Sequence, residues 1–216
     1  MIDVRSFTVG PVAENCYFVR LPGAESAVVI DPGDEAERLV GALTQLGIAR
    51  VEAILITHTH FDHVGAVSAL HNATGAPVYV PELERHVLAD LNAHVSIPGF
   101  GPFESYEAEH TVAGGETLEL AGLRFDVRFT PGHSPGHVTY AIADEGALFS
   151  GDVLFKGSVG RVDLPGGDWP TLLSSIESLL EEFEPEATVY PGHMGLTTLG
   201  AERASNPFLR ELAQRS

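Results

Sequence analysis

The chain has 216 residues, of which 44% are apolar and 19% charged, a balance typical of an ordinary soluble globular domain. Lys and Arg number 12 against 30 Asp and Glu, and the resulting net charge of −18 disfavours general binding to nucleic acids or anionic membranes. The single cysteine, Cys16, excludes a disulfide scaffold and every thiolate-rich zinc module, and it fits a reducing compartment.

The N-terminal segment alternates polar and apolar residues like a strand, and it lacks the basic and apolar regions of a signal peptide. A membrane-spanning helix is not expected either, because no apolar run reaches the roughly 18 residues that one needs. We therefore expect a cytoplasmic protein that acts on a small molecule. The oligomeric state is not readable from the sequence.

In chain order, short apolar runs bounded by Gly and Pro predict strands at 15–20, 27–30, 53–56, 78–80, 118–120, 125–129, 139–142, 148–149 and 188–190. Helical periodicity predicts helices at 35–46, 62–72, 82–93, 169–183 and 206–213. This alternation indicates a layered α/β domain, and no linker or repeat divides it. The irregular stretch 94–115 is either a lid or a surface insertion.

Four of the predicted strands deliver a chemically active side chain just past their C-terminal ends. These side chains are His58, His133, Asp152 and His193. Loops at that edge of an α/β sheet are rooted by the strands and are the usual place for ligands. We therefore expect the active site there.

The first of these strand ends carries a dense cluster of possible metal ligands. His58 and His60 are separated by one residue on an extended segment, so they point to the same side and can share one ion. Asp62 and His63 fall at the start of the following helix, and this offset suits a second ion nearby. The other histidines, His71, His86, His94, His110 and His137, are interpreted as structural.

Imidazole and carboxylate ligands without thiolate suit two divalent ions, of which zinc is the commonest choice for hydrolysis and iron or manganese are possible. One ion would be held by His58, His60 and His133. The other would be held by Asp62, His63 and His193, and Asp152 would then bridge the two.

At this point the chain resembles a known family. The His-x-His-x-Asp-His segment at 58–63, a later Pro-Gly-His, a Ser-Gly-Asp and a final Pro-Gly-His occur in the order typical of the metallo-β-lactamase fold superfamily. The resemblance implies a four-layer αββα sandwich of two mixed sheets, with helices outside and a binuclear metal site at one edge. Asp31 matches the first motif of that superfamily, which implies a hydrogen bond to the histidine loop; a simple strand-end turn is the alternative.

Segments 151–161, 164–168 and 197–209 are most similar to the short glyoxalase II-like hydrolases, also called hydroxyacylglutathione hydrolase-like proteins. Full-length glyoxalase II carries a further C-terminal helical domain, whereas 23 residues follow His193, so we expect one domain spanning 1–216 without that addition. Met194 stands where these proteins usually have glycine. Arg161, with Lys156 in the same loop, is the expected contact for an anionic thiol carrier, unless Arg161 pairs with Asp163 or Asp168.

The resemblance implies hydrolysis of a thioester by a metal-bound hydroxide, which requires no Ser or Cys nucleophile. Asp62 and Asp152 are the expected catalytic carboxylates, because they can orient that hydroxide or receive its proton. Three alternatives stay open: a non-haem iron persulfide dioxygenase, a lactonase, and a protein that binds metal without catalysis.

Overall fold

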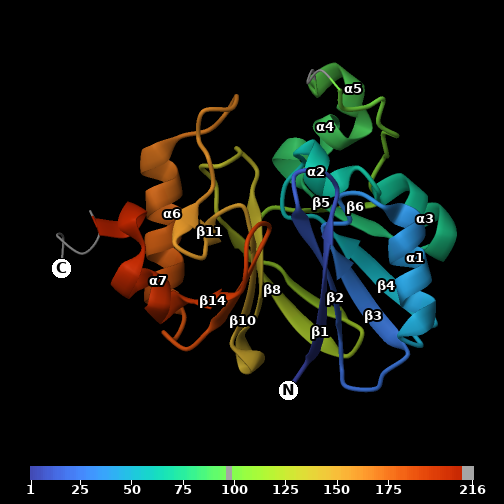
Figure 1. Cartoon of the computed structure of the whole chain (residues 1–216), viewed down its shortest axis with the longest axis horizontal. Helices are drawn as coiled ribbons and strands as arrows, with labels where there is room; N and C mark the ends of the chain where they lie inside the picture. The colour runs from blue at the N-terminus through green and yellow to red at the C-terminus, as the bar shows by residue number, and fades with distance from the viewer. Residues whose placement is uncertain (96–98, 211–216) are drawn as a thin grey trace. The chain divides into compact units, whose positions relative to one another are not determined.

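The computed structural model describes residues 1–95 and 99–210, and its contacts group into two compact units. The N-terminal unit comprises Met1–Val112 and Glu119–Arg124, and the C-terminal unit comprises Ala113–Leu118 and Phe125–Ser216. Each unit is built around a mixed six-stranded sheet with helices beside it (Figure 1). The predicted fold class, α/β with two mixed sheets and flanking helices, is thereby confirmed.

The N-terminal unit has the strand order β1-β2-β3-β4-β5-β6. Its strands are β1 (Asp3–Val9), β2 (Glu14–Arg20), β3 (Ser26–Ile30), β4 (Arg50–Leu55), β5 (Val78–Pro81) and β6 (His110–Val112). The strands β1, β2 and β3 pair antiparallel, whereas β3 to β6 pair parallel. The central strands of this sheet, β3 and β4, contain continuous apolar runs. Such runs are characteristic of strands buried on both faces, and Val28, Val29, Ile54 and Leu55 are indeed fully buried.

Helices of this unit bury one face against its sheet. They are α1 (Ala36–Gln45), α2 (Phe61–Val64), α3 (Val67–Thr74), η1 (Glu82–Glu84), α4 (Arg85–Ala89) and α5 (Leu91–His94). Leu39 of α1 and Leu70 of α3 join Val29 and Ile54 in one buried cluster, with α1 and α3 lying side by side in Figure 1. Because successive residues of a strand point to opposite faces, Val29 and Ile54 define the sheet face that these helices cover.

The second sheet has the order β14-β13-β10-β9-β8-β7. Its strands are β7 (Thr117–Leu120), β8 (Leu123–Phe129), β9 (Val138–Ile142), β10 (Ala147–Gly151), β13 (Thr188–Pro191) and β14 (Thr197–Thr198), with a separate hairpin of β11 (Leu154–Phe155) and β12 (Ser158–Val159). Because β9 is antiparallel to both β8 and β10, and β10 is parallel to β13, the strands β8, β10 and β13 end at the same edge.

The helical elements of the C-terminal unit are η2 (Ala143–Glu145), α6 (Trp169–Glu182), α7 (Leu199–Ser205) and η3 (Pro207–Leu209). The longest, α6, is N-capped by Asp168, whose carboxylate accepts a hydrogen bond from the Thr171 backbone N–H at 2.9 Å. Leu172 and Ile176 of α6 pack with Leu148 of β10 in a second buried cluster. Within the part of the chain that the structure describes, no helix has the length and apolarity to cross a membrane.

The sequence expectations fail mainly for helices. The predicted helix 62–72 is two helices, α2 and α3, and 82–93 is divided among η1, α4 and α5. The prediction at 206–213 is wrong in its described part, because Asn206 caps only the short η3, while 211–216 lie outside the described residues. In the irregular stretch, β6 was missed, and Phe103 and Tyr106 pack against the N-terminal core.

Candidate metal centre

In the N-terminal unit, the end of β4 places two histidines of the predicted cluster against each other. His58 is fully buried and His60 half-buried, and His58 Nε2 lies 3.1 Å from His60 Nδ1. Two nitrogens that bind one tetrahedral zinc ion at the usual bond lengths are about 3.3 Å apart. The two imidazoles therefore converge as ligands of one ion would.

Asp31 fixes the orientation of the loop that carries His58 and His60, through hydrogen bonds to Thr57. One of its carboxylate oxygens accepts a bond from the Thr57 backbone N–H at 2.8 Å, and the other accepts from the Thr57 hydroxyl at 2.6 Å. The Thr57 hydroxyl has only one hydrogen and donates it to Asp31. The hydroxyl oxygen must therefore accept the hydrogen bond from His58 Nδ1, at 3.1 Å. His58 therefore carries its proton on Nδ1 and directs a lone pair from Nε2, as a metal ligand must.

His63 is oriented by the same carboxylate. At the start of α2, its Nδ1 donates to Asp31 Oδ2 at 3.0 Å, which leaves Nε2 as the ligand nitrogen. This Nε2 lies 3.9 Å from Asp62 Oδ2. The four predicted residues of the cluster thus gather at one end of β4, and the hydrogen bonds of Asp31 are those expected of its predicted role.

Two buried carboxylates beside the cluster were missed by the sequence analysis. Glu84 Oε2 accepts from both the backbone N–H and the hydroxyl of Thr59, at 2.7 and 2.9 Å, and so holds the residue between the two histidines. Glu14 is fully buried in β2, with one oxygen 3.7 Å from His63 Nδ1. Neither lies in a recognisable motif, since Glu84 is 25 positions from Thr59 and both read as ordinary surface acids.

The C-terminal unit gathers the other three predicted ligands by itself. Asp152 Oδ2 lies 3.5 Å from His133 Nε2 and also 3.5 Å from His193 Nε2. They follow β8, β10 and β13, whose shared end brings them together. One oxygen of Asp152 thus lies equally far from the two imidazole nitrogens.

Hydrogen bonds also fix the protonation of the histidines in this unit. His133 Nδ1 donates to the backbone carbonyl of Arg161 at 2.7 Å, so its Nε2 carries the lone pair that faces Asp152. His137 Nε2 accepts from the Asp152 backbone N–H at 3.1 Å, and its Nδ1 donates to the Thr130 hydroxyl. His137 therefore positions Asp152 and has no lone pair to offer an ion.

The donor sets in both units fit divalent metal ions. Five imidazoles and two carboxylates supply only nitrogen and oxygen, which suits zinc, iron or manganese. Each of the five histidines presents a ring nitrogen toward a carboxylate or a second imidazole. His60, Asp62 and His193 are partly exposed, so each group of ligands has a solvent-facing side.

The predicted contacts to an anionic carrier have different environments. The Arg161 guanidinium forms a double hydrogen bond with Asp163, at 2.6 and 2.7 Å, and both side chains are exposed. That ion pair lowers the pKa of Asp163 to about 2. Lys156 is exposed in the turn between β11 and β12. The pairing of Arg161 with Asp163 is the alternative that the sequence analysis left open.

No activated thiol competes with a metal site in the described chain. Cys16 is fully buried in β2, and burial, reinforced by the Glu14 and Asp31 carboxylates, raises the pKa of its thiol. The thiolate that a nucleophile needs is therefore suppressed. Met194 adopts a left-handed conformation with φ of 69° beside His193, which explains why glycine is usual at that position.

Residues 9–193 match the family model described as "Metallo-beta-lactamase superfamily", and the chain belongs to that superfamily. Among curated relatives, the chain is 37% identical to "Probable metallo-hydrolase YqgX" of Bacillus subtilis (strain 168), covering 95% of this chain and 96% of that protein. It is 34% identical to "Hydroxyacylglutathione hydrolase GloC" of Haemophilus influenzae, covering 96% of this chain and 98% of the relative. The superfamily membership supports a metal-dependent hydrolase.

Two solved structures extend the comparison. The BLEG-1 B3 metallo-beta-lactamase has a TM-score of 0.90 and 40% identity, over 96% of this chain and 99% of its own. TTHA1623, solved in a di-iron-bound form, has a TM-score of 0.79 and 43% identity, over 95% of this chain and all of its own. The superfamily typically uses two divalent metals, and these neighbours leave the metal of this chain open.

Proposed function

We propose that the protein is a binuclear metal-dependent hydrolase that cleaves thioesters of the hydroxyacylglutathione class. The observation that carries this proposal is the similarity to the hydroxyacylglutathione hydrolase of Haemophilus influenzae, which extends over nearly the full length of both chains. The orientation of the candidate ligands supports it, because the lone pairs of His58, His63 and His133 are fixed by hydrogen bonds to Nδ1.

The proposed ligand sets are those that the motif order predicts. His58, His60 and His133 would hold one ion, Asp62, His63 and His193 would hold the other, and Asp152 would be shared by both. Zinc is the first candidate metal for hydrolysis. The di-iron-bound form of TTHA1623 makes iron the second.

When bound, such ions acidify a coordinated water and polarise the carbonyl of the substrate. The protein's own residues provide the rest of the chemistry. Asp62 or Asp152 would orient the attacking water or accept its proton, while Asp31 and Glu84 hold the histidine loop in place through Thr57 and Thr59. The leaving thiolate needs little acid assistance.

Recognition of the thiol carrier is proposed for Lys156 and Arg161. A glutathione-like carrier bears carboxylates, and both cations lie in the loop that follows Asp152. The Arg161 guanidinium would have to exchange part of its bonding with Asp163 for a substrate carboxylate. A reducing cytoplasm is the proposed location, since it keeps the released thiol reduced.

The proposal is tested by assaying the purified protein against a panel of acyl thioesters on glutathione, N-acetylcysteamine and coenzyme A. Free-thiol release is measured beside elemental analysis of bound metal. Hydrolysis of a glutathione thioester that is lost with metal removal and restored by zinc is the expected result. Absence of thiol release by a fully metal-loaded protein would overturn the proposal.

A second candidate is an iron-dependent persulfide dioxygenase, because TTHA1623, at 43% identity, was solved with iron bound. It is distinguished by oxygen uptake with glutathione persulfide, because a hydrolase consumes no oxygen. A β-lactam belongs in the same panel, since BLEG-1 is titled a B3 metallo-beta-lactamase.

A further inference from the structure

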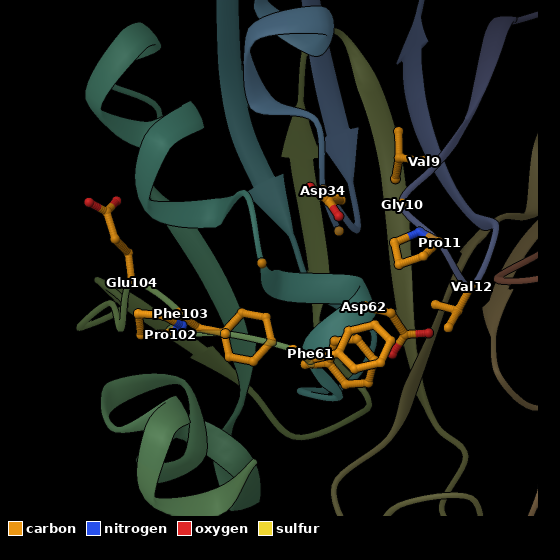
Figure 2. A pocket seen from close by; sticks show the side chains of 14 residues that line it. Val9, Gly10, Pro11, Val12, Asp34, Phe61, Asp62, Pro102, Phe103 and Glu104 are labelled. Carbon is orange, nitrogen blue, oxygen red and sulfur yellow. The ribbon is translucent and has the colours of Figure 1, made fainter. Parts of the chain in front are cut away.

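A cavity of about 330 Å³ lies within the N-terminal unit, beside the candidate metal ligand Asp62. Figure 2 shows Phe61, Phe103, Pro11 and Val12 around it. Its size is at the lower end of the range for pockets that bind small molecules. The function proposed above does not use this cavity.

One wall is aromatic. The Phe61 ring, at the start of α2, lies 4.8 Å from the Phe100 ring and 5.6 Å from the Phe103 ring, measured between centroids. The segment that carries Phe103 is anchored, because its backbone N–H donates to the Asn92 side chain at 2.9 Å and its carbonyl accepts from the same amide at 2.8 Å. The described part of the predicted lid thus forms one side of a built cavity.

The opposite wall is the turn between β1 and β2, which contributes Val9, Gly10, Pro11 and Val12. This turn is fastened to the start of α1, since the Gly10 backbone N–H donates to a Glu35 carboxylate oxygen at 3.0 Å. The wall is therefore apolar and held in place before any ligand arrives. Preorganised apolar walls favour an apolar group over water.

The polar groups in the lining are acidic. They are the carboxylates of Asp34, Asp62 and Glu104, and no basic side chain lines the cavity among the residues that the structure describes. The charge of Asp62 is neutralised if it binds a cation, whereas those of Asp34 and Glu104 remain. An anionic group is therefore repelled, and an uncharged apolar group is accepted.

We infer that this cavity receives the acyl group of the substrate, and that the acyl groups it selects are apolar and uncharged, with aryl groups favoured by the Phe61, Phe100 and Phe103 wall. This inference rests on the proposed thioester hydrolysis. Glutathione and coenzyme A are anionic carriers, so the acidic lining excludes them from this cavity. Only the acyl half of the substrate has the chemistry that the cavity accepts.

The test compares three thioesters that share glutathione as carrier and differ in the acyl group: S-acetyl, S-benzoyl and S-succinyl. With the zinc-loaded enzyme, kcat/KM should be highest for benzoyl and lowest for succinyl. Phe103→Ala should reduce the preference for benzoyl over acetyl about tenfold, the effect typical of a small change in an apolar pocket. Phe208→Ala, at a half-exposed phenylalanine of the other unit, is the matched control.

The charge of the lining is tested with Asp34→Asn, which keeps the oxygen that accepts from the Glu35 backbone N–H at 2.6 Å. Removing the negative charge should raise the ratio of kcat/KM for the succinyl thioester to that for the acetyl thioester several-fold. Asp144→Asn makes the same change in net charge at an exposed position in η2 and should alter neither.

Direct binding separates this inference from the proposed function. Benzamide, an uncharged aryl probe, is titrated into the zinc-loaded protein while backbone amide resonances are followed by NMR. Shifts at Val12 that Phe103→Ala abolishes would support the cavity even if no thioester is cleaved. Thioester hydrolysis with an acyl preference that neither Phe103→Ala nor Asp34→Asn changes would overturn the inference and leave the proposed function intact.

Discussion

Glu84 acts on the histidine motif from 25 positions away, through its two hydrogen bonds to Thr59. Replacing it with alanine frees the residue between His58 and His60, so zinc affinity should fall about 10- to 100-fold, the usual effect of losing a partner that orients metal ligands. Glu84→Gln retains an acceptor oxygen and should keep most of the affinity. Competition with a chromogenic chelator measures both variants.

The control for Glu84 is Glu82→Ala, a change at an exposed position of the same η1 turn. It should bind zinc like the unmodified protein. Thermal unfolding followed by circular dichroism shows whether Glu84→Ala is folded. Equal zinc affinity in folded Glu84→Ala and in Glu82→Ala would show that Glu84 does not position the ligands.

Asp152 is the residue whose loss should affect both ions, because one of its oxygens lies equally far from His133 Nε2 and His193 Nε2. Asp152→Ala is therefore expected to lower the metal content of dialysed protein by more than one ion per chain. His58→Ala should lower it by about one. A folded Asp152→Ala protein that keeps two tightly bound ions by elemental analysis would contradict the bridging role.

The candidate site residues that lie in compact motifs could be predicted from the sequence. Those that contact the motifs from distant positions in the chain could not. The cluster from His58 to His63 stood out because its members are adjacent in the chain, and strand ends pointed to His133, Asp152 and His193. Glu14 and Glu84 could not be found in this way. Their importance comes from burial beside the histidines, and burial of a single acid has no sequence signature.

At the scale of elements, the approach of the β3 to α1 turn to α2 depends on a glycine. A Cβ atom on Gly33 would lie 1.6 Å from the backbone oxygen of Asp62, so backbone must move if alanine is placed there. Gly33→Ala should destabilise the protein by about 1–3 kcal/mol and shift the Asp62 ligand. Urea unfolding measures the stability, and zinc affinity reports the displacement.

A glycine-to-alanine substitution at Gly41 is the control for Gly33→Ala. Gly41 lies inside α1, and a Cβ there would meet nothing within 4 Å. Gly41→Ala should therefore stabilise the protein by about 1 kcal/mol, because alanine is the better helix former. If Gly33→Ala proves as stable as Gly41→Ala, then the close approach of Gly33 to Asp62 does not constrain the site.

The elements that the sequence predicted well are those with a long or continuous apolar pattern. All the predicted strands have a counterpart, whereas the short β6, β11, β12 and β14 were missed because two or three residues carry no usable period. The predicted helix 62–72 is divided because Gly65 ends α2 and the Ala66 backbone N–H donates to the Pro32 carbonyl instead of continuing the helix. A hydrogen bond between residues so far apart in the sequence cannot be predicted from hydrophobic periodicity.

At the scale of the whole molecule, the net charge of −18 opposes the arrival of an anionic thioester. The Arg161 guanidinium does little to offset this, because its charge is paired with the Asp163 carboxylate, whose pKa the guanidinium lowers to about 2. Long-range repulsion should therefore dominate the encounter with a glutathione thioester.

This long-range repulsion is tested by varying the salt concentration. Raising the ionic strength from about 0.01 to 0.15 M shortens the screening length from about 30 to 8 Å, so kcat/KM for S-benzoylglutathione should rise several-fold. S-benzoyl-N-acetylcysteamine carries the same acyl group without charge and should show no salt effect.

Asp163→Asn leaves the Arg161 cation unneutralised and should raise kcat/KM for the anionic thioester at low salt. Arg161→Ala should raise KM for that thioester and not for the neutral one. A fall in kcat/KM with salt would mean that local cations outweigh the net charge, and equal responses of both thioesters would place Arg161 in the architecture of the loop.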